Sequence, residues 1–153
     1  MAISLARDTA RDLRQLCDDL EPRVLQQLGF ASAATALTRR ISSRHDIEIE
    51  VNVEAAETLG ENAAVALYQI LREAIEQAVK RGGLTRIEIS LQATDAGGVE
   101  LVVQDDGSPE RRAAVLDALA ERAATLNGRF SSEVRFPRGS TIRIDVPPVA
   151  AHR

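Results

Sequence analysis

The chain has 153 residues, enough for one domain with a substantial hydrophobic core. Apolar residues make up 44% and charged residues 27%, which excludes a fibrous or disordered chain, and the core must be aliphatic because only 3% of residues are aromatic. The net charge of −4, with basic residues scattered along the chain, argues against a nucleic-acid-binding groove.

The N-terminal region predicts a helix over residues 3–20, because its apolar residues recur at helical spacing. Its apolar stripe consists of Leu5, Leu13, Leu16 and Leu20, and we expect this stripe to pack in a homodimer or against a helical partner. The single cysteine, Cys17, excludes an internal disulfide and is expected to be a buried thiol. Because the region has no hydrophobic signal core and the chain has no membrane-length apolar run, we predict a soluble, cytoplasmic protein with no membrane segment.

After Gly29, which is expected to stop a short helix, the chain alternates between helical and strand periodicity. Helices are predicted over residues 31–43, 59–81 and 113–126. Strands with one buried face are predicted over residues 47–54, 86–93, 99–105, 129–136 and 140–147. The first of these strands has a long acidic outer face, which suits an exposed sheet surface.

This order of elements predicts an α/β fold: a two-layer sandwich of a mixed sheet and helices, with an N-terminal helical arm. We place the arm at residues 1–29, the sandwich at 30–148 and a tail at 149–153, which is expected to be frayed.

Four segments in sequence order carry a family resemblance. They are LRQLCDDLEPRVLQQLGFASAATAL, ALYQILREAIEQAVKR, LVVQDDG and LNGRFSSEVRFPRGSTIRIDVP. Together they resemble the end of the second dimerisation helix with its linker, the N-box helix, the G1 box and the closing hairpin of a sensor histidine kinase. The class is the one that pairs with NarL-like response regulators. The resemblance covers residues 12–147 and implies the Bergerat-type ATP-binding fold that these kinases share with gyrase-type ATPases, Hsp90 and certain anti-sigma factors.

The resemblance also implies roles for individual residues. Glu73 matches the acid that orients or activates a water or hydroxyl, and Gln77 stands where an asparagine carries Mg²⁺. Asp105 matches the acceptor of the adenine amino group, Gly107 the glycine that passes close to the base, and Ser140 a residue that supports the same pocket. The basic or histidine position at the end of the N-box helix corresponds to Arg81 in this sequence.

Several positions depart from the family pattern. The longer side chain of Gln77 displaces its amide oxygen by ~1.5 Å, and Mg²⁺ demands near-ideal octahedral geometry. Pro109 replaces a second glycine, and Val115 and Ala118 stand where the phosphate-binding glycines belong. Ser108-Pro109-Glu110 reads as a capped helix start, so a helix is predicted in place of the flexible lid.

The residues alone leave simpler interpretations open. Glu73 and Gln77 also fit a solvated helix face, and Asp105-Asp106-Gly107 fits a strand-ending turn. Arg111, Arg112 and Arg138 are most simply surface charges, and His45 is expected at the surface in the turn before a strand. The other histidine, His152, lies in the tail and is expected to have no role, so no obvious phospho-acceptor is present.

Three functions are therefore considered. The first is a degenerate histidine-kinase ATP-binding domain in two-component signalling, catalytically impaired and acting through protein–protein contacts, with a response regulator as one partner. The second is a working ATP-binding catalytic domain of a sensor histidine kinase, with ATP and Mg²⁺ as cofactors. The third is a non-enzymatic regulator of the same fold, similar to an anti-sigma factor or a phosphotransfer protein. Changes in the metal, base and phosphate positions together favour the first, so we expect no enzyme activity from the isolated chain and, if it is active, histidine kinase activity.

Overall fold

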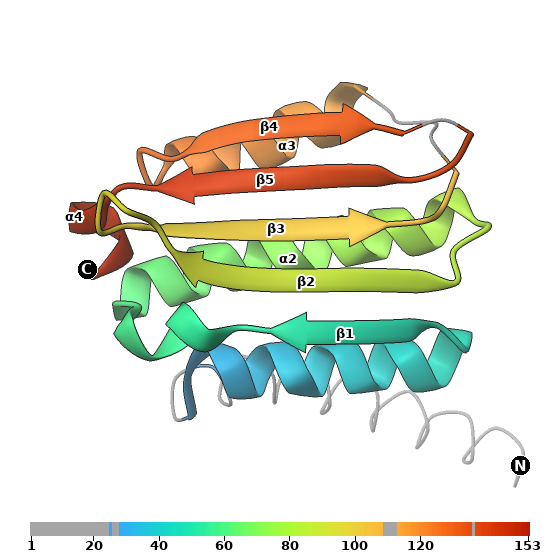
Figure 1. Cartoon of the computed structure of the whole chain (residues 1–153), viewed down its shortest axis with the longest axis horizontal. Coiled ribbons are helices and arrows are strands. Elements are labelled where there is room, and N and C mark those ends of the chain that lie inside the picture. Colours follow the sequence, from blue (N-terminus) through green and yellow to red (C-terminus); the bar gives the residue numbers. More distant parts are fainter. Residues whose placement is uncertain (1–24, 26–27, 109–112, 136) are drawn as a thin grey trace, which may run out of the picture.

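The computed structural model describes residues 25, 28–108, 113–135 and 137–153. A five-stranded mixed sheet with strand order β1-β2-β3-β5-β4 forms one layer of the molecule (Figure 1). Its strands are β1 (Glu48–Asn52), β2 (Arg86–Ala93), β3 (Val99–Asp105), β4 (Arg129–Val134) and β5 (Ser140–Val146). Strands β1 and β2 pair in parallel, and the other three pairings are antiparallel.

Helices form the second layer. They are a helix over residues 28–45, the 3-10 helix η1 (Glu54–Thr58), α2 (Glu61–Arg81), α3 (Ala113–Ala124) and the short α4 (Pro148–Ala151). In Figure 1, α2 lies behind β2 and β3, α3 lies behind β4 and β5, and the helix over 28–45 runs along β1. The predicted two-layer α/β sandwich with a mixed sheet is confirmed.

Among the helices that the structure describes in full, the longest, α2, is positioned by its apolar face. Leu67, Ile70, Leu71 and Ile75 recur at helical spacing and are fully buried against the sheet. The helix ends where predicted, at Gly82, whose φ of 79° is in the left-handed region that favours glycine. Its last residue, Arg81, is thereby held at the edge of the sheet where β3 ends.

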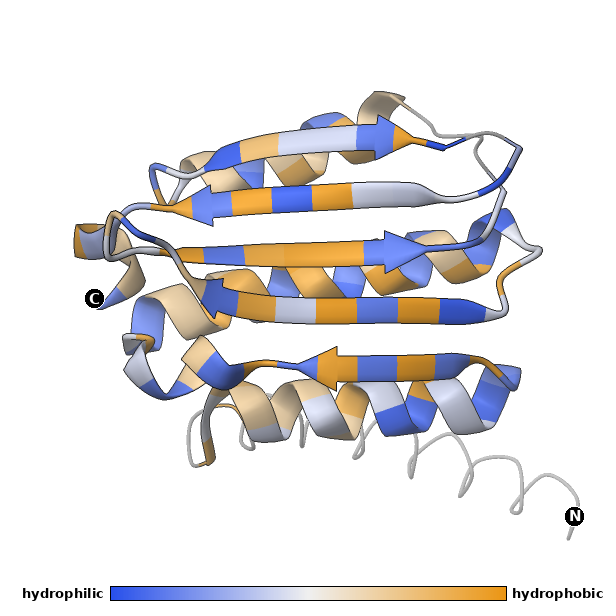
Figure 2. Ribbon diagram, in the orientation of Figure 1, coloured by the Kyte–Doolittle hydropathy of each residue, from blue (hydrophilic) through white to orange (hydrophobic). Residues whose placement is uncertain are grey.

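The sheet has one buried and one open face. On β2, β3 and β5 the inward positions include Ile87, Leu91, Leu101 and Ile144, which are fully buried, and each contributes roughly 1.5–3 kcal/mol of hydrophobic stabilisation. Figure 2 shows the resulting alternation of apolar and polar residues along these strands. This period-2 pattern is the one from which the strands were predicted.

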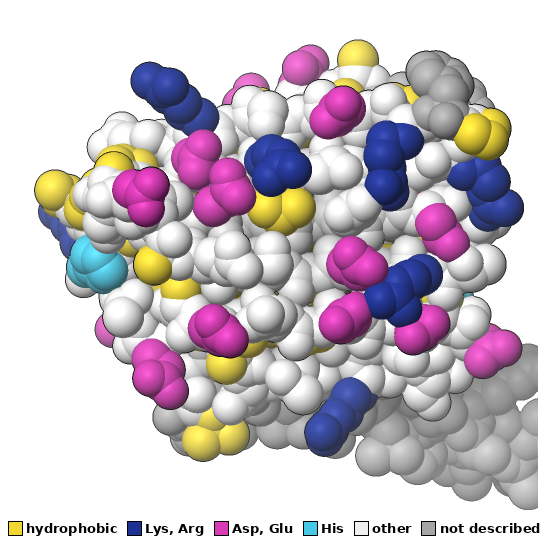
Figure 3. Space-filling view, in the orientation of Figure 1, with side chains coloured by type: hydrophobic (Ala, Val, Ile, Leu, Met, Phe, Trp, Pro, Cys, Tyr) yellow, Lys and Arg dark blue, Asp and Glu magenta, His cyan; other side chains and the backbone are white. Residues whose placement is uncertain are grey.

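The open face is polar and rich in acids, as Figure 3 shows. Arg86 at the start of β2 forms ion pairs with Glu48 (2.7 Å), Glu50 (2.6 Å) and Glu88 (3.0 Å) on the same face. The acidic outer face predicted for β1 is confirmed.

The tail differs from the prediction, because it is not frayed. Ala151 is fully buried, and its carbonyl accepts a hydrogen bond of 2.9 Å from the Gly60 N–H ahead of α2. The Arg153 carbonyl accepts a second hydrogen bond, of 3.1 Å, from the Asn62 N–H. The close approach depends on Gly60, where a Cβ would overlap the Arg153 backbone. Sequence periodicity cannot detect such docking, which consists of main-chain contacts.

His152 also has a structural role that was not expected. Its Nδ1 lies 2.8 Å from the Thr58 carbonyl oxygen and its Nε2 lies 2.9 Å from the Gly97 carbonyl oxygen. Both ring nitrogens can donate only in the imidazolium form. The contact with Thr58, followed by that with Gly97, therefore raises the pKa of His152 above its ordinary value of 6.5.

Some predictions fall outside the described residues, namely the helix over 3–20 with its apolar stripe, Cys17, and the helix start at 109–110. Among the described helices, none is long and apolar enough to cross a membrane. Gly29 was predicted to stop a short helix, but it lies within the helix over 28–45, so this prediction is wrong, although its φ of 86° is one that favours glycine. The 3-10 helix η1 was not predicted, because a single short turn has no periodicity of its own.

Candidate functional site

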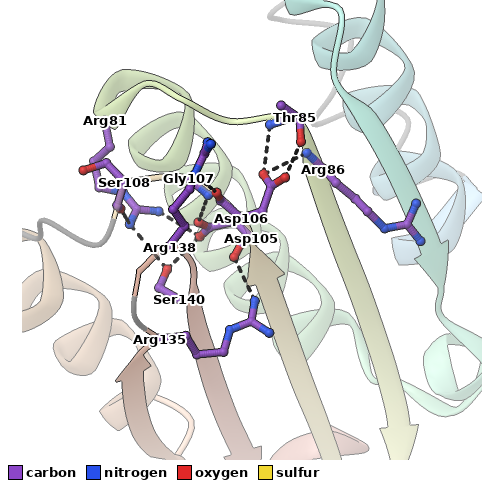
Figure 4. Close-up of polar contacts among 10 residues, drawn as sticks. All are labelled: Arg81, Thr85, Arg86, Asp105, Asp106, Gly107, Ser108, Arg135, Arg138 and Ser140. Carbon is purple, nitrogen blue, oxygen red and sulfur yellow. Dashed lines mark hydrogen bonds and ion pairs between the residues drawn. The ribbon is translucent and has the colours of Figure 1, made fainter.

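The candidate site lies at the end of the sheet where β3 ends, β5 begins and α2 finishes (Figure 4). Asp105 is the last residue of β3, and Ser140 is the first residue of β5, directly opposite it in the antiparallel register. Gly107 follows Asp105 in the loop. The structure therefore brings together the three residues that the resemblance assigns to base binding.

The Asp105 carboxylate is the centre of this cluster. It is 4% exposed and accepts three hydrogen bonds from the chain. Its Oδ2 accepts from the Ser140 hydroxyl at 2.8 Å and from Arg81 Nη2 at 2.8 Å, and its Oδ1 accepts from the Gly107 N–H at 3.0 Å. Arg81 is itself only 16% exposed, so this is a largely buried ion pair. A buried carboxylate needs such partners, because desolvation disfavours an unpaired charge.

The backbone of the loop over residues 105–108 is held by the rest of the chain. Each of its four carbonyl oxygens accepts a hydrogen bond. The donors are Arg135 to Asp105 (3.0 Å), Arg138 to Asp106 (3.1 Å), the Gly139 N–H to Gly107 (2.9 Å) and Arg81 to Ser108 (2.7 Å). Three arginines from two different parts of the chain thus hold one loop. Arg138, which was predicted to be a surface charge, is exposed but also donates to the Gly83 carbonyl.

Gly107 fits tightly inside this loop. A Cβ at this position would lie 3.3 Å from Asp105 Oδ1 and 3.3 Å from the Gly82 carbonyl oxygen. The absence of a side chain therefore allows the loop to pack against the end of α2 and allows the Gly107 N–H to reach Asp105.

The neighbouring carboxylate, Asp106, faces the other way, toward the start of β2. It accepts hydrogen bonds from the Thr85 N–H (2.9 Å), the Thr85 hydroxyl and the Arg86 N–H (3.0 Å). Partial burial opposes its ionisation, but these hydrogen bonds, together with the positive charge of Arg138, outweigh it and hold the pKa of Asp106 below its usual value. Asp106 therefore fixes the strand end and leaves Asp105 as the acceptor in the site.

Glu73 is not part of this cluster. It lies on α2 about 12 Å along the helix axis from Arg81, because the two are eight residues apart. Its Oε2 forms an ion pair of 2.9 Å with Arg122 Nε of α3, and Arg122 also donates to Gln69 at 3.2 Å. Both carboxylates to which the resemblance gives a role are thus paired with arginines of this chain.

The residues at the metal and phosphate positions match the family pattern less well than those at the base position. Gln77 is half-buried one turn after Glu73 on α2. In the described part of the chain, no three His, Cys, Asp or Glu side chains gather as metal ligands. Val115 and Ala118, at the positions of the phosphate-binding glycines, lie within α3, so helix replaces loop there.

A separate apolar hollow of about 450 Å³ lies at the start of α2, away from these residues. Its lining includes Leu25, Leu28, Phe30, Leu59 and Val65. Leu28 is 66% exposed. None of the residues predicted for the site is among those that line it.

Comparisons with known proteins agree with this fold. No protein-family model matches the chain. The sensor histidine kinase MctS of Rhizobium johnstonii is 31% identical over 99 residues, which cover 64% of this chain and 21% of that protein. The oxygen sensor histidine kinase NreB of Staphylococcus carnosus is 24% identical over 89% of this chain and 41% of its own length. The NarQ homologue of Haemophilus influenzae is 28% identical over 80% of this chain and 23% of its own length. The chain therefore spans less than half of each of these relatives.

Solved structures support the fold. The histidine kinase domain of the blue-light-activated kinase EL346 from Erythrobacter litoralis superposes with a TM-score of 0.64 at 15% identity, over 82% of this chain and 62% of that one. The ATP-binding domain of PrrB from Mycobacterium tuberculosis superposes with a TM-score of 0.60 at 21% identity, over 72% of this chain and 88% of that one.

The sequence relatives are thus sensor histidine kinases, and the fold is that of histidine-kinase ATPase domains, as the sequence motifs predicted.

Sequence reasoning missed the arginine partners. Arg81 was assigned only to a family position, and neither Arg122 nor Arg135 was singled out. Arg81 and Asp105 are 24 residues apart, and no spacing rule links a helix end to a strand end. The one available signal was the number of arginines near the loop, four of which lie in the segments RFPR and ERR.

Proposed function

We propose that this chain is a histidine-kinase ATPase-like domain of a two-component signalling system whose nucleotide site is impaired and which acts through protein–protein contacts. The family supports the signalling role. The observation that carries the impairment is the pairing of both functional carboxylates with arginines of the same chain: Asp105 with Arg81, and Glu73 with Arg122.

The pairing of Asp105 bears on nucleotide binding. The resemblance assigns its carboxylate to a purine amino group, and that carboxylate already accepts from Arg81, Ser140 and Gly107. A charge-assisted hydrogen bond from a guanidinium is roughly twice as strong as one from a neutral amino group. A nucleotide must therefore compete with a stronger internal donor.

The pairing of Glu73 bears on catalysis. A carboxylate that is to orient or activate a hydroxyl needs a free oxygen directed at it. In this chain, Arg122 holds Oε2 of Glu73 at 2.9 Å. The Glu73 side chain thereby points toward α3, and its ion pair links α2 to α3.

ATP with Mg²⁺ remains the ligand to test, since the family members include ATP-binding domains. When bound, ATP would supply the transferable phosphoryl group and Mg²⁺ would neutralise its charge. Asp105, Gly107 and Ser140 would hold the base, and Gln77 would be a metal ligand with its oxygen displaced by ~1.5 Å from that of an asparagine. That displacement and the helical positions of Val115 and Ala118 weaken the fit to the phosphates.

A working ATP-binding domain is the second candidate. The observation in its favour is that Asp105, Gly107 and Ser140 lie together at the strand ends. In either case we propose a response regulator as partner and a homodimer or helical partner through residues 1–29.

Calorimetric titration with ATP and ADP, with and without Mg²⁺, distinguishes the two candidates. An impaired site predicts no binding tighter than about 100 μM, equivalent to roughly −5.5 kcal/mol. Tighter binding that is lost in Asp105→Ala would refute the impairment and support the working domain.

A further inference from the structure

The Asp105 carboxylate is covered by donors of the same chain, and what we infer from this rests on the proposed function. The two oxygens of this carboxylate are not equivalent. Oδ1 faces the loop and accepts from Gly107, whereas Oδ2 accepts from both Arg81 and Ser140. A carboxylate has about four lone-pair directions, and three are used in a group that is 4% exposed.

Arg81 differs from the other arginines of the site. Figure 4 shows Arg81 reaching from the end of α2 to the carboxylate, with Ser108 and Ser140 beside it. Its Nη1 donates to the Ser108 carbonyl at 2.7 Å and lies 3.4 Å from the Ser140 hydroxyl, while its Nη2 pairs with Asp105. Arg135 and Arg138 instead donate to main-chain carbonyls of the loop. In the described part of the chain, the arginine that forms an ion pair with the Asp105 carboxylate is Arg81.

The base of α2 places Arg81 beside two residues that have left-handed backbones. Gly82 and Gly83 have φ values of 79° and 68°, so the helix stops immediately after Arg81. Arg81 is therefore the last residue of α2, and no further turn of helix follows it.

We propose that Arg81 is the specificity-determining residue of this pocket: it occupies the Asp105 oxygen to which a 6-aminopurine would donate, so that a purine enters only when the Arg81–Asp105 ion pair opens. The guanidinium acts as an internal substitute for the exocyclic amino group of adenine. The apparent dissociation constant is then the intrinsic one divided by the fraction of molecules in which the pair is open.

The chemistry sets the class of ligand. Asp105 is an acceptor, so the ligand must present a donor at the position that Arg81 leaves. An adenine presents its amino group there, whereas a 6-oxopurine presents a carbonyl oxygen that the carboxylate repels. Removal of Arg81 is therefore expected to admit ATP and adenosine but not GTP or ITP.

The experiment compares Arg81→Met with Arg143→Met by calorimetric titration with ATP, adenosine and GTP. Methionine keeps the apolar stem of Arg81 and removes the guanidinium. Arg143→Met is the control, because it makes the same change at a half-exposed arginine of β5 that pairs with Glu100 at 3.5 Å and has no contact with the Asp105 carboxylate. We expect Arg81→Met to bind ATP and adenosine at least about tenfold more tightly than the wild type, Arg143→Met to bind like the wild type, and Arg81→Met/Asp105→Ala to lose the gain.

Arg81→Gln provides a second variant if Arg81→Met does not fold, since it keeps a neutral donor near Ser108. Circular dichroism and a cooperative thermal transition establish folding for each variant. Folded Arg81 variants that bind no more tightly than the wild type would overturn the proposal, as would an equal gain in Arg143→Met or an equal gain for GTP. If neither Arg81 variant folds, Arg81 is required for folding and the proposal also fails.

The same titrations distinguish a failure of the role of Arg81 from a failure of the impaired site. Tight ATP binding by the wild type refutes the impaired site, yet Arg81 still sets specificity if its removal tightens adenosine binding further. Absence of binding by the wild type and by the folded Arg81 variants leaves the impaired site standing and refutes the role of Arg81.

Discussion

The buried ion pair between Arg81 and Asp105 makes a quantitative prediction for stability. Arg81→Met leaves a carboxylate that is 4% exposed with only the Ser140 hydroxyl and the Gly107 N–H as partners. Removal of one member of a buried pair costs about 3–5 kcal/mol, and we expect the lower end, about 3 kcal/mol, because two donors remain. For a chain of this length, that corresponds to a fall in Tm of roughly 6–12 °C.

Urea denaturation followed by far-UV circular dichroism measures this change. Arg138→Met is the control, and it is expected to cost about 1 kcal/mol because it removes hydrogen bonds to backbone carbonyls at an exposed position. The double variant Arg81→Met/Asp105→Asn should be more stable than Arg81→Met alone, since it removes the uncompensated charge. A loss below about 0.5 kcal/mol for Arg81→Met would show that the pair is not formed in solution, and the reasoning about the pocket would fail with it.

Three further predictions address other parts of the molecule. The pKa of His152 is raised in the folded state, so its stabilising contribution is complete below the unfolded pKa and is lost as the pH rises through the folded pKa. The difference in unfolding free energy between the wild type and His152→Gln should therefore shrink as the pH rises above 6.5. A pH-independent difference in urea titrations would contradict this. Gly98→Ala directs a Cβ at the Val146 carbonyl and is expected to lower the free energy of unfolding by about 1–3 kcal/mol. The control Asp95→Ala, in the exposed part of the same loop, should change it little. Equal urea midpoints for the two variants would refute the close approach of Gly98 to the Val146 backbone. Arg122→Met removes a half-exposed partner of Glu73 and should cost no more than about 1 kcal/mol, so a loss above about 2 kcal/mol in thermal unfolding would contradict a surface-type ion pair.

Most of the fold was predictable from local patterns. The alternating residues of β2, β3 and β5 each have one face that must be buried, and their predicted limits agree with the structure to within one residue. The length of α2 followed from its apolar spacing and from Gly82, whose left-handed φ ends the helix. These features depend on neighbours within a few residues, so a single sequence contains them.

The candidate site was predictable in its members but not in its contacts. The motifs pointed to Asp105, Gly107 and Ser140, and the antiparallel register of β3 and β5 brings them together. The motifs did not indicate that Arg81 would occupy the carboxylate or that Arg122 would pair with Glu73. Which oppositely charged groups meet depends on how α2 and α3 lie on the sheet, and many surface arginines were equally available in the sequence.

The sequence by itself thus determined the order of elements, the faces that are buried and the resemblance to sensor histidine kinases, because the periodicity of apolar residues and the short motifs are local properties. Only the tertiary structure decided that the tail is docked through main-chain bonds to Gly60 and Asn62, and that the Asp105 carboxylate is satisfied from within the chain. The physical reason is the same in both cases. A buried polar group must find a partner, and the partner that it finds is set by the spatial approach of segments that are distant in the sequence.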